Sequence, residues 1–354
     1  MIKILVLNGS PKSGNSNTMY LTRAFLNGAK WADAEIIDVA KANVKGCLGC
    51  FACWNKTPGK CVINDGMSEI LIKLIAADVV IWSFPLYYFG VPGELKNLID
   101  RQLPLSLPFM AEGTESGGHP MRYKVTHQKH LVISTCGFWT SKGNYDAVIP
   151  MFDHFCGKDK YTTVLCGQGE LFSVPELKGR TDAYLETIRR AGAEYAAGGI
   201  RAETQAELAE PLYPRDVFEK MADASWGIAK GEDAGVPADE SHSFTTQMAA
   251  LYRPDGVERV LEFHYTDIDR TYQILLTKQG SEVITENFKP YTTRIETPYS
   301  LWRSISRNEI SGKDALFQRL YKVIGDFNLM LKWDELFGTS APPKGADVTP
   351  SRKT

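Results

Sequence analysis

The sequence lacks both a long apolar run and an excess of charge of one sign. No stretch of about 18 apolar residues occurs, which excludes a transmembrane helix of ordinary length. The net charge of −2 is close to neutral and argues against nucleic acid as the main partner. No signal-peptide pattern precedes the first apolar strand, so we expect a cytoplasmic protein whose seven cysteines are not paired as disulfides.

Two catalytic signatures are also absent. The six histidines are scattered and include no His-x-x-x-His pair, so a histidine metal site is not expected. No Gly-x-Ser-x-Gly sequence is present to expose a nucleophilic serine, and hydrolase chemistry therefore lacks support. We identify no residue as a dedicated catalytic acid or base.

The first motif that is present is a loop at residues 8–18, Asn-Gly-Ser-Pro-Lys-Ser-Gly-Asn-Ser-Asn-Thr. It follows the apolar run 4–7, which is typical of a parallel strand buried on both faces. A helical pattern begins behind it, and Ser16 or Asn17 is well placed to cap that helix. A strand, a hydroxyl-rich loop and a helix start together form an anion site, because unpaired N–H groups and the positive dipole end face the loop.

The loop does not match two common phosphate-binding motifs. It lacks the Gly-x-x-x-x-Gly-Lys-Ser/Thr of nucleoside-triphosphate loops and the Gly-x-Gly-x-x-Gly of dinucleotide folds. A monophosphate surrounded by hydroxyl groups is what FMN requires in a flavodoxin-like doubly wound fold. The alternative is an ordinary strand-to-helix turn with capping residues.

Apolar strands and amphipathic helices alternate through the first part of the chain. Strands are expected at 4–7, 35–39, 79–82, 131–134 and 161–165, with helices near 17–28, 67–75, 95–99 and 185–195. This alternation predicts a five-stranded parallel sheet in a three-layer α/β domain that ends near Trp226. Residues 102–128 form an insertion of unusual length, which favours a lid or a subunit contact.

The pattern changes in the last third of the chain. Strands are expected at 257–266, 271–278, 283–287 and 291–295, followed by helices at 301–305, 316–324 and 329–337. This order indicates a smaller α+β domain. The predicted organisation is a first domain over 1–228, a linker over 229–241, a second domain over 242–338 and a disordered tail over 339–354.

Four cysteines lie within fifteen residues: Cys47, Cys50, Cys53 and Cys61. Zinc usually takes two Cys-x-x-Cys pairs with a longer spacer, so the fit to zinc is poor. Three cysteines at i, i+3 and i+6 with a fourth nearby is the way a chain surrounds an iron–sulfur cluster. The alternative is four reduced thiols in a flavin-proximal loop that holds no metal.

These motifs together resemble the NADPH-dependent FMN reductase family and, within it, the iron–sulfur flavoproteins. The resemblance covers about residues 1–200, and it departs at Gly66, where relatives usually have aspartate. It is carried by Gly9-Ser10-Pro11 through Asn17-Thr18, the cysteine loop ending in Asn64-Asp65-Gly66-Met67, and Ser83-Phe84-Pro85-Leu86-Tyr87 with Pro92-Gly93.

The resemblance implies a flavodoxin-like fold, bound FMN, a [4Fe–4S] cluster on the four cysteines, NAD(P)H as donor, and a homodimer or homotetramer. It implies that the FMN phosphate lies against Ser10, Ser16, Asn17 and Thr18, with Lys12 nearby. It implies that the flavin ring lies against Pro85, Leu86, Tyr87, Tyr88, Phe89, Gly90, Thr135, Cys136, Gly137 and Phe138. Both sets follow strand ends, where ligands bind in doubly wound sheets.

Residues 242–338 resemble the sterol carrier protein fold. The resemblance is carried by the strands followed by Ser300-Leu301-Trp302-Arg303-Ser304-Ile305, by Asn308-Glu309-Ile310-Ser311-Gly312 and by an apolar helix. It implies an apolar cavity for a hydrophobic ligand. The alternative is a domain whose apolar faces are filled by its own side chains, because periodicity does not separate a tunnel from a core.

We therefore expect an FMN-dependent oxidoreductase that moves electrons between a small-molecule donor and acceptor through flavin, with an iron–sulfur cluster beside it. One alternative is a cluster-free NAD(P)H-dependent quinone or nitro-compound reductase. A second, from a different class, is a carrier of hydrophobic ligands whose flavin domain senses redox state.

Overall fold

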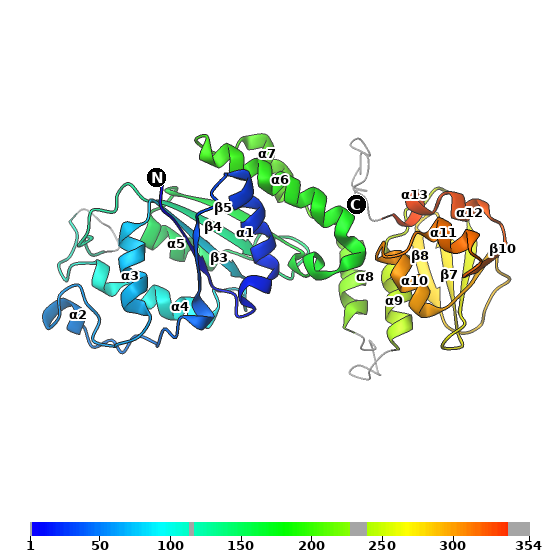
Figure 1. Ribbon diagram of the computed structural model, residues 1–354, viewed down its shortest axis with the longest axis horizontal. Helices are drawn as coiled ribbons and strands as arrows, with labels where there is room; N and C mark the ends of the chain where they lie inside the picture. Colours follow the sequence, from blue (N-terminus) through cyan, green and yellow to red (C-terminus); the bar gives the residue numbers. More distant parts are fainter. Residues whose placement is uncertain (1, 113–116, 227–238, 339–354) are drawn as a thin grey trace, which may run out of the picture. The chain divides into compact units, whose positions relative to one another are not determined.

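The computed structural model describes residues 2–112, 117–226 and 239–338 (Figure 1). Contacts between residues divide the chain into two compact units. The first consists of Met1–Ser173 and Tyr184–Leu212, and the second of Val174–Ala183 and Tyr213–Thr354. The predicted boundary at 228 and the tail 339–354 lie outside the described residues, as does the linker up to residue 238. Within the described ranges, no helix is long and apolar enough to cross a bilayer.

The first unit is built on one parallel sheet. Its strands are β1 (Ile4–Asn8), β2 (Glu35–Asp38), β3 (Val79–Pro85), β4 (Lys129–Thr135) and β5 (Tyr161–Cys166). They lie in the order β2-β1-β3-β4-β5, and every neighbouring pair is parallel. This is the flavodoxin-like order. The chain first adds β2 on one side of β1 and then adds β3, β4 and β5 on the other side, so the strand order reverses between β1 and β3. The predicted doubly wound five-stranded sheet is confirmed.

Helices cover both faces of this sheet, which is why its central strands are continuous apolar runs (Figure 1). The helices are α1 (Asn17–Gly28), α2 (Ala52–Asn55), α3 (Met67–Ala76), α4 (Gly93–Asp100), α5 (Val148–Cys156), α6 (Lys178–Ala196) and α7 (Ala202–Ala209). On one face, α3, α4 and α5 bury apolar side chains against the strands, with Trp82, Phe84 and Phe152 in the centre.

On the other face, α1 contacts α6 backbone to backbone. A Cβ on Gly28 would lie 1.8 Å from the carbonyl oxygen of Arg189. A Cβ on Gly192 would lie 2.1 Å from the carbonyl oxygen of Phe25. Both positions therefore require glycine, since any side chain would push the two helices apart.

The second unit contains a mixed sheet. Its strands are β6 (Arg259–Tyr265), β7 (Arg270–Thr277), β8 (Gly280–Ile284), β9 (Thr293–Thr297) and β10 (Lys322–Gly325), in the order β10-β9-β6-β7-β8. Only the pairing of β6 with β9 is parallel among these neighbours. The helices are α8 (Arg215–Ser225), α9 (Glu240–Ala250), α10 (Tyr299–Ser306), α11 (Gly312–Phe317), α12 (Asn328–Leu331) and α13 (Trp333–Phe337).

Aromatic side chains fill the interior of the second unit. Phe263 and Trp302 have ring centroids 5.1 Å apart, and Trp302 and Trp333 are 5.4 Å apart. Tyr265 lies 5.3 Å from Tyr299. Contacts at these distances are those of a closely packed core.

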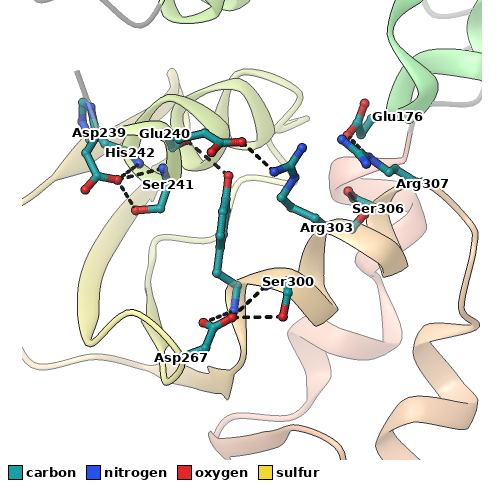
Figure 2. A network of polar contacts seen from close by, with 11 residues as sticks. Glu176, Asp239, Glu240, Ser241, His242, Asp267, Ser300, Arg303, Ser306 and Arg307 are labelled. Atoms are coloured by element: carbon teal, nitrogen blue, oxygen red, sulfur yellow. Dashed lines mark hydrogen bonds and ion pairs between the residues drawn. The ribbon is translucent and has the colours of Figure 1, made fainter. Parts of the chain in front are cut away.

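Polar contacts fix α10 at its start and along its length (Figure 2). The Asp267 carboxylate accepts hydrogen bonds from the backbone N–H groups of Tyr299 at 2.6 Å and Ser300 at 3.1 Å. Further along, Arg303 pairs with Glu240 of α9 at 2.6 Å. Charge-assisted contacts to the first N–H groups of a helix stabilise that end.

One predicted helix is wrong. Residues 316–324 were expected to be helical because Leu316, Leu320, Val323 and Ile324 recur at helical spacing. Instead α11 ends at Phe317 and Lys322–Gly325 form strand β10, paired antiparallel with β9. Arg319 has a φ of 59°, a left-handed conformation that ends the helix. Val323 and Ile324 therefore belong to a strand at the edge of the sheet.

Two further expectations of the second unit differ from the structure. The strand predicted at 283–287 lies at Gly280–Ile284, because Gly280 begins the strand instead of the turn. Helices α8 and α9 precede the sheet and were not predicted. The α9 sequence is rich in Ser and Thr and has no strong apolar face, so its periodicity gives little signal.

Candidate functional site

The hydroxyl-rich loop lies between β1 and α1, at the switch in strand order. The backbone N–H of Gly9 donates to the carbonyl oxygen of Ser83 at 2.8 Å, which ties the loop to β3. Ser16 caps α1 as predicted, and its Oγ accepts from the N–H of Met19 at 3.3 Å. The first N–H groups of an α-helix have no intrahelical acceptor, and in α1 these are the groups at its start, beside the loop. The loop therefore offers N–H and hydroxyl donors at a positive helix end.

The polar side chains of the loop differ in how far they are buried. Ser10 and Ser16 are buried, Asn17 is half-buried, and Lys12 is exposed. The Thr18 Oγ1 lies 2.6 Å from the Oγ1 of Thr135, at the end of β4. This contact brings together two segments that are 117 residues apart. It places the loop beside the end of β4.

The segment after β3 forms a tight reverse turn. Tyr87 and Gly90 exchange two backbone hydrogen bonds, at 3.0 and 2.9 Å. The two residues between them, Tyr88 and Phe89, have φ values of 46° and 62°. Left-handed values at both central positions are those of a type I′ turn, which favours Asn-Gly. Aromatic residues in this conformation store backbone strain, which is typical of functional sites.

The turn and the end of β4 meet through aromatic and backbone contacts. The N–H of Leu86 donates to the carbonyl oxygen of Thr135 at 2.8 Å. The rings of Phe89 and Phe138 are stacked, with centroids 5.4 Å apart and planes 15° apart. Tyr88 is fully exposed, with a relative accessibility of 100%. The predicted flavin-ring segments 85–90 and 135–138 therefore lie side by side.

Burial raises the pKa of the Cys136 thiol, and the Glu170 carboxylate adds to this effect. The Sγ of Cys136 contacts the carbonyl oxygen of Thr140 at 3.6 Å. A Cβ on Gly137 would lie 2.3 Å from the Oε1 of Glu170, so glycine makes room for that carboxylate. Sequence reasoning missed Glu170, although its position four residues after the end of β5 is a signal of the same kind as that of Cys136.

The four clustered cysteines line one cavity. Its walls include Cys47, Cys50, Cys53 and Cys61, with Leu48, Phe51 and Arg101. Gly49 and Phe51 have φ values of 62° and 51°. These left-handed residues separate consecutive cysteines and turn the loop sharply. Cys53 is buried, Cys61 is half-buried, and Cys47 and Cys50 are exposed.

The thiols of this cavity influence one another. Burial raises the pKa of Cys53, and the neighbouring Cys61, Cys50 and Cys47 raise it further. Within the described ranges, no three His, Cys, Asp or Glu side chains are grouped as they would be around a single metal ion. A tetrahedral zinc ion holds sulfur at about 2.3 Å, which demands thiols in close contact. All four thiols nevertheless line the same cavity.

Arg101 and Asp65 form a buried ion pair beside this cavity, and each side chain is only 1% exposed. Burial by itself would raise the pKa of Asp65, but hydrogen bonds from Arg101 and from the N–H groups of Lys45 and Met67 lower it. The contact to Met67 lies at the start of α3, whose N-cap residue is Gly66. Sequence reasoning did not single out Arg101, which follows the end of α4.

The N-terminal part of the chain matches a known family. Residues 2–140 match the family model described as NADPH-dependent FMN reductase. An iron–sulfur flavoprotein of Methanocaldococcus jannaschii is 36% identical over 118 residues, which are 33% of this chain and 60% of the relative. One from Methanosarcina thermophila is 35% identical over 106 residues, 29% of this chain and 54% of the relative. The chain thus spans little more than half the length of these relatives.

Solved structures give a weaker likeness. An FMN-dependent NADH-azoreductase from Bacillus anthracis, in complex with FMN, has a TM-score of 0.38 and 20% identity, covering 59% of this chain and 100% of that one. An NAD(P)H:quinone oxidoreductase from Methanothermobacter marburgensis has a TM-score of 0.40 and 18% identity, covering 55% and 96%. The fold assignment therefore rests on the observed strand order.

Proposed function

We propose that this protein is an FMN-dependent oxidoreductase whose flavin lies at the carboxyl ends of β1, β3 and β4. The observation that carries the proposal is the contact between Thr18 and Thr135, at 2.6 Å, which fixes the hydroxyl-rich loop beside β4 at the switch in strand order. Ligands of doubly wound sheets bind at this place. The match of residues 2–140 to the FMN reductase family supports the same cofactor.

The donor set of the loop fits a phosphate group. Ser10, Ser16, Asn17 and Thr18 would surround it, and the exposed Lys12 would add a positive charge nearby. The flavin ring would lie against Pro85, Leu86, Tyr87, Tyr88, Phe89, Gly90, Thr135, Cys136, Gly137 and Phe138. When bound, FMN supplies hydride transfer and one-electron transfer.

No residue is assigned as a catalytic acid or base. The residues of the chain would therefore bind the flavin and orient its ring. The turn from Tyr87 to Gly90 holds Phe89 on Phe138, and this stacked pair would exclude water from one side of the ring. Exposed Tyr88 would meet the incoming donor or acceptor. NAD(P)H as donor and a small molecule as acceptor belong to this proposal, as does a homodimer or homotetramer.

We further propose that Cys47, Cys50, Cys53 and Cys61 hold a [4Fe–4S] cluster. The four thiols line one cavity, as the ligands of a single cluster would. Cluster ligands are thiolates, so the proposal includes a reducing, cytoplasmic compartment. When bound, such a cluster supplies one-electron transfer. Relatives named iron–sulfur flavoproteins support this assignment.

Two alternatives have a specific observation in their favour. The exposure of Cys47 and Cys50 favours a cluster-free NAD(P)H-dependent reductase of quinones or nitro compounds. The likeness of residues 242–338 to sterol carrier proteins favours a carrier of hydrophobic ligands with a redox-sensing flavin domain. The aromatic packing around Trp302 argues against an open cavity in that unit.

The test is an absorption spectrum with iron and acid-labile sulfide analysis on protein purified without oxygen. We expect flavin bands with a broad additional absorbance and about four irons per chain. Cys50→Ser should remove the broad absorbance and leave the flavin bound, whereas Cys156→Ser, a half-buried thiol of α5, should change neither. Flavin without iron would indicate the simple reductase. The absence of flavin would overturn the proposal, and a copurifying lipid would favour the carrier.

A further inference from the structure

Arg101 places a fixed positive group on the cavity that the four cysteines line. Its side chain is 1% exposed, and a guanidinium stays charged at any pH a protein tolerates. Buried charges in proteins are paired with another group, because an unpaired charge is costly to bury. The surrounding hydrogen bonds show which nitrogen atoms of the guanidinium already have an acceptor.

Both terminal nitrogens of Arg101 donate hydrogen bonds to oxygen atoms of Lys45 and Asp65. Nη1 donates to the carbonyl oxygen of Lys45 at 2.8 Å and to the Oδ2 of Asp65 at 3.0 Å. Nη2 donates to the Oδ1 of Asp65 at 3.0 Å. Asp65 is held in turn by the N–H groups of Lys45 and Met67, at 3.0 and 3.1 Å. The plane of the guanidinium is therefore fixed.

The Nε–H of Arg101 is different. Within the described residues it is buried and has no hydrogen-bond partner. Leaving a buried donor unsatisfied costs about 1–3 kcal/mol, so such a group calls for an explanation. Arg101 and Cys61 line the same cavity, so a sulfur ligand bound there would lie near the guanidinium.

We infer that Arg101 is a positioning residue that donates its Nε–H to a sulfur of the bound cluster, either the Cys61 thiolate or an adjacent sulfide. This inference rests on the proposed cluster. Because Asp65 balances the charge of Arg101, the effect of Arg101 on the cluster comes from the hydrogen bond that its Nε–H donates. Hydrogen bonds to cluster sulfurs favour the more negative, reduced state. Arg101 therefore raises the reduction potential of the cluster and holds the fourth ligand in place.

The test is a redox titration of the cluster in Arg101→Lys, monitored by electron paramagnetic resonance. Lysine keeps the charge that Asp65 needs but lacks the fixed Nε–H. We expect the ratio of reduced to oxidised cluster at a given potential to fall about tenfold, which is about 59 mV for a one-electron couple. The control is Lys60→Gln, which removes an exposed charge next to Cys61 and should leave the potential close to that of the native protein.

A second measurement needs no substitution. Native protein containing 15N-arginine, with the cluster reduced, should show a 15N hyperfine coupling by pulsed electron paramagnetic resonance. A cluster with about four irons but no 15N coupling, or an unchanged potential in Arg101→Lys, would overturn the role of Arg101 and leave the cluster proposal standing. Native protein without iron would instead overturn the cluster proposal and this inference with it.

Discussion

His130 lies near the start of β4, where the Nε1 of Trp82 donates to its Nδ1 at 3.3 Å. An imidazole that accepts this hydrogen bond is unprotonated at that nitrogen. Burial lowers the pKa of His130 from 6.5 to about 4. Between these values the unfolded chain binds more protons than the folded one.

We therefore expect acid to destabilise the first unit through His130. Lowering the pH from 7.5 to 5 should reduce the free energy of unfolding by about 2 kcal/mol, because only the unfolded state gains the proton. Denaturant unfolding at the two pH values measures this loss. His130→Gln keeps an acceptor for Trp82 and should remove most of the difference. An equal pH dependence in the variant would contradict the assignment.

Tyr88 gives a second prediction at this scale. It is fully exposed and has a φ of 46°, so its side chain contributes little packing while its backbone is strained. Tyr88→Asn should stabilise the protein by about 1 kcal/mol, because asparagine tolerates the left-handed conformation. Thermal unfolding measures the gain.

The control for Tyr88 is Tyr20→Asn, which replaces an exposed tyrosine in α1 and should destabilise slightly. If Tyr88 meets the donor or acceptor, Tyr88→Asn should also raise KM with kcat less affected. A variant with unchanged stability would show that the turn is not strained.

Helices α1 and α11 are each capped by a serine and offer a matched pair at the scale of elements. Ser16 accepts from the N–H of Met19, and Ser311 accepts from the N–H of Asp314, both at 3.3 Å. Ser16→Ala and Ser311→Ala should each cost about 1 kcal/mol of stability. Only Ser16→Ala should weaken FMN binding, by about tenfold, because a hydrogen bond to a charged group is worth about 1.5 kcal/mol or more.

Fluorescence titration of flavin-free protein with FMN measures that difference. If both variants bind FMN as tightly as the native protein, Ser16 does not belong to the proposed phosphate site. If both lose affinity by the same factor, the loss is a general effect of reduced stability.

The sequence allowed some elements to be predicted better than others, for physical reasons. β1 and β3 are buried on both faces, so their apolar runs are continuous and easy to recognise. β10 is a short edge strand with mostly exposed residues, and its apolar spacing also fits a helix. The loop 8–18 was recognisable from its hydroxyls. The pairing of Thr18 with Thr135 was not, because no local pattern records a contact between distant segments.

The same limit applies to the cysteine cavity. The spacing of Cys47, Cys50 and Cys53 indicated a common centre. The role of Arg101 depends on its ion pair with Asp65, which joins positions 36 residues apart. A single sequence gives no sign that this arginine is buried.

At the scale of the whole molecule, each unit has its own hydrophobic core. We expect calorimetry of the full chain to resolve two transitions. FMN at 100 times its Kd should stabilise the first unit by about 2.7 kcal/mol and leave the second unchanged.

Trp302 tests the second transition. It is 3% exposed and its Nε1 lies 3.3 Å from the Sδ of Met248. Trp302→Ala should destabilise the second unit by about 3–5 kcal/mol, whereas Leu331→Ala, at an exposed position, should change little. FMN binding should be unaffected by either. One transition that shifts with both FMN and Trp302→Ala would contradict two separate cores.

The contact of α1 with α6 has a consequence for how this chain can vary. Because Gly28 and Gly192 bring the two backbones together, these two glycines set the distance between the helices. A side chain at either position would displace α1 from α6 and would move the helix start at Ser16 with it.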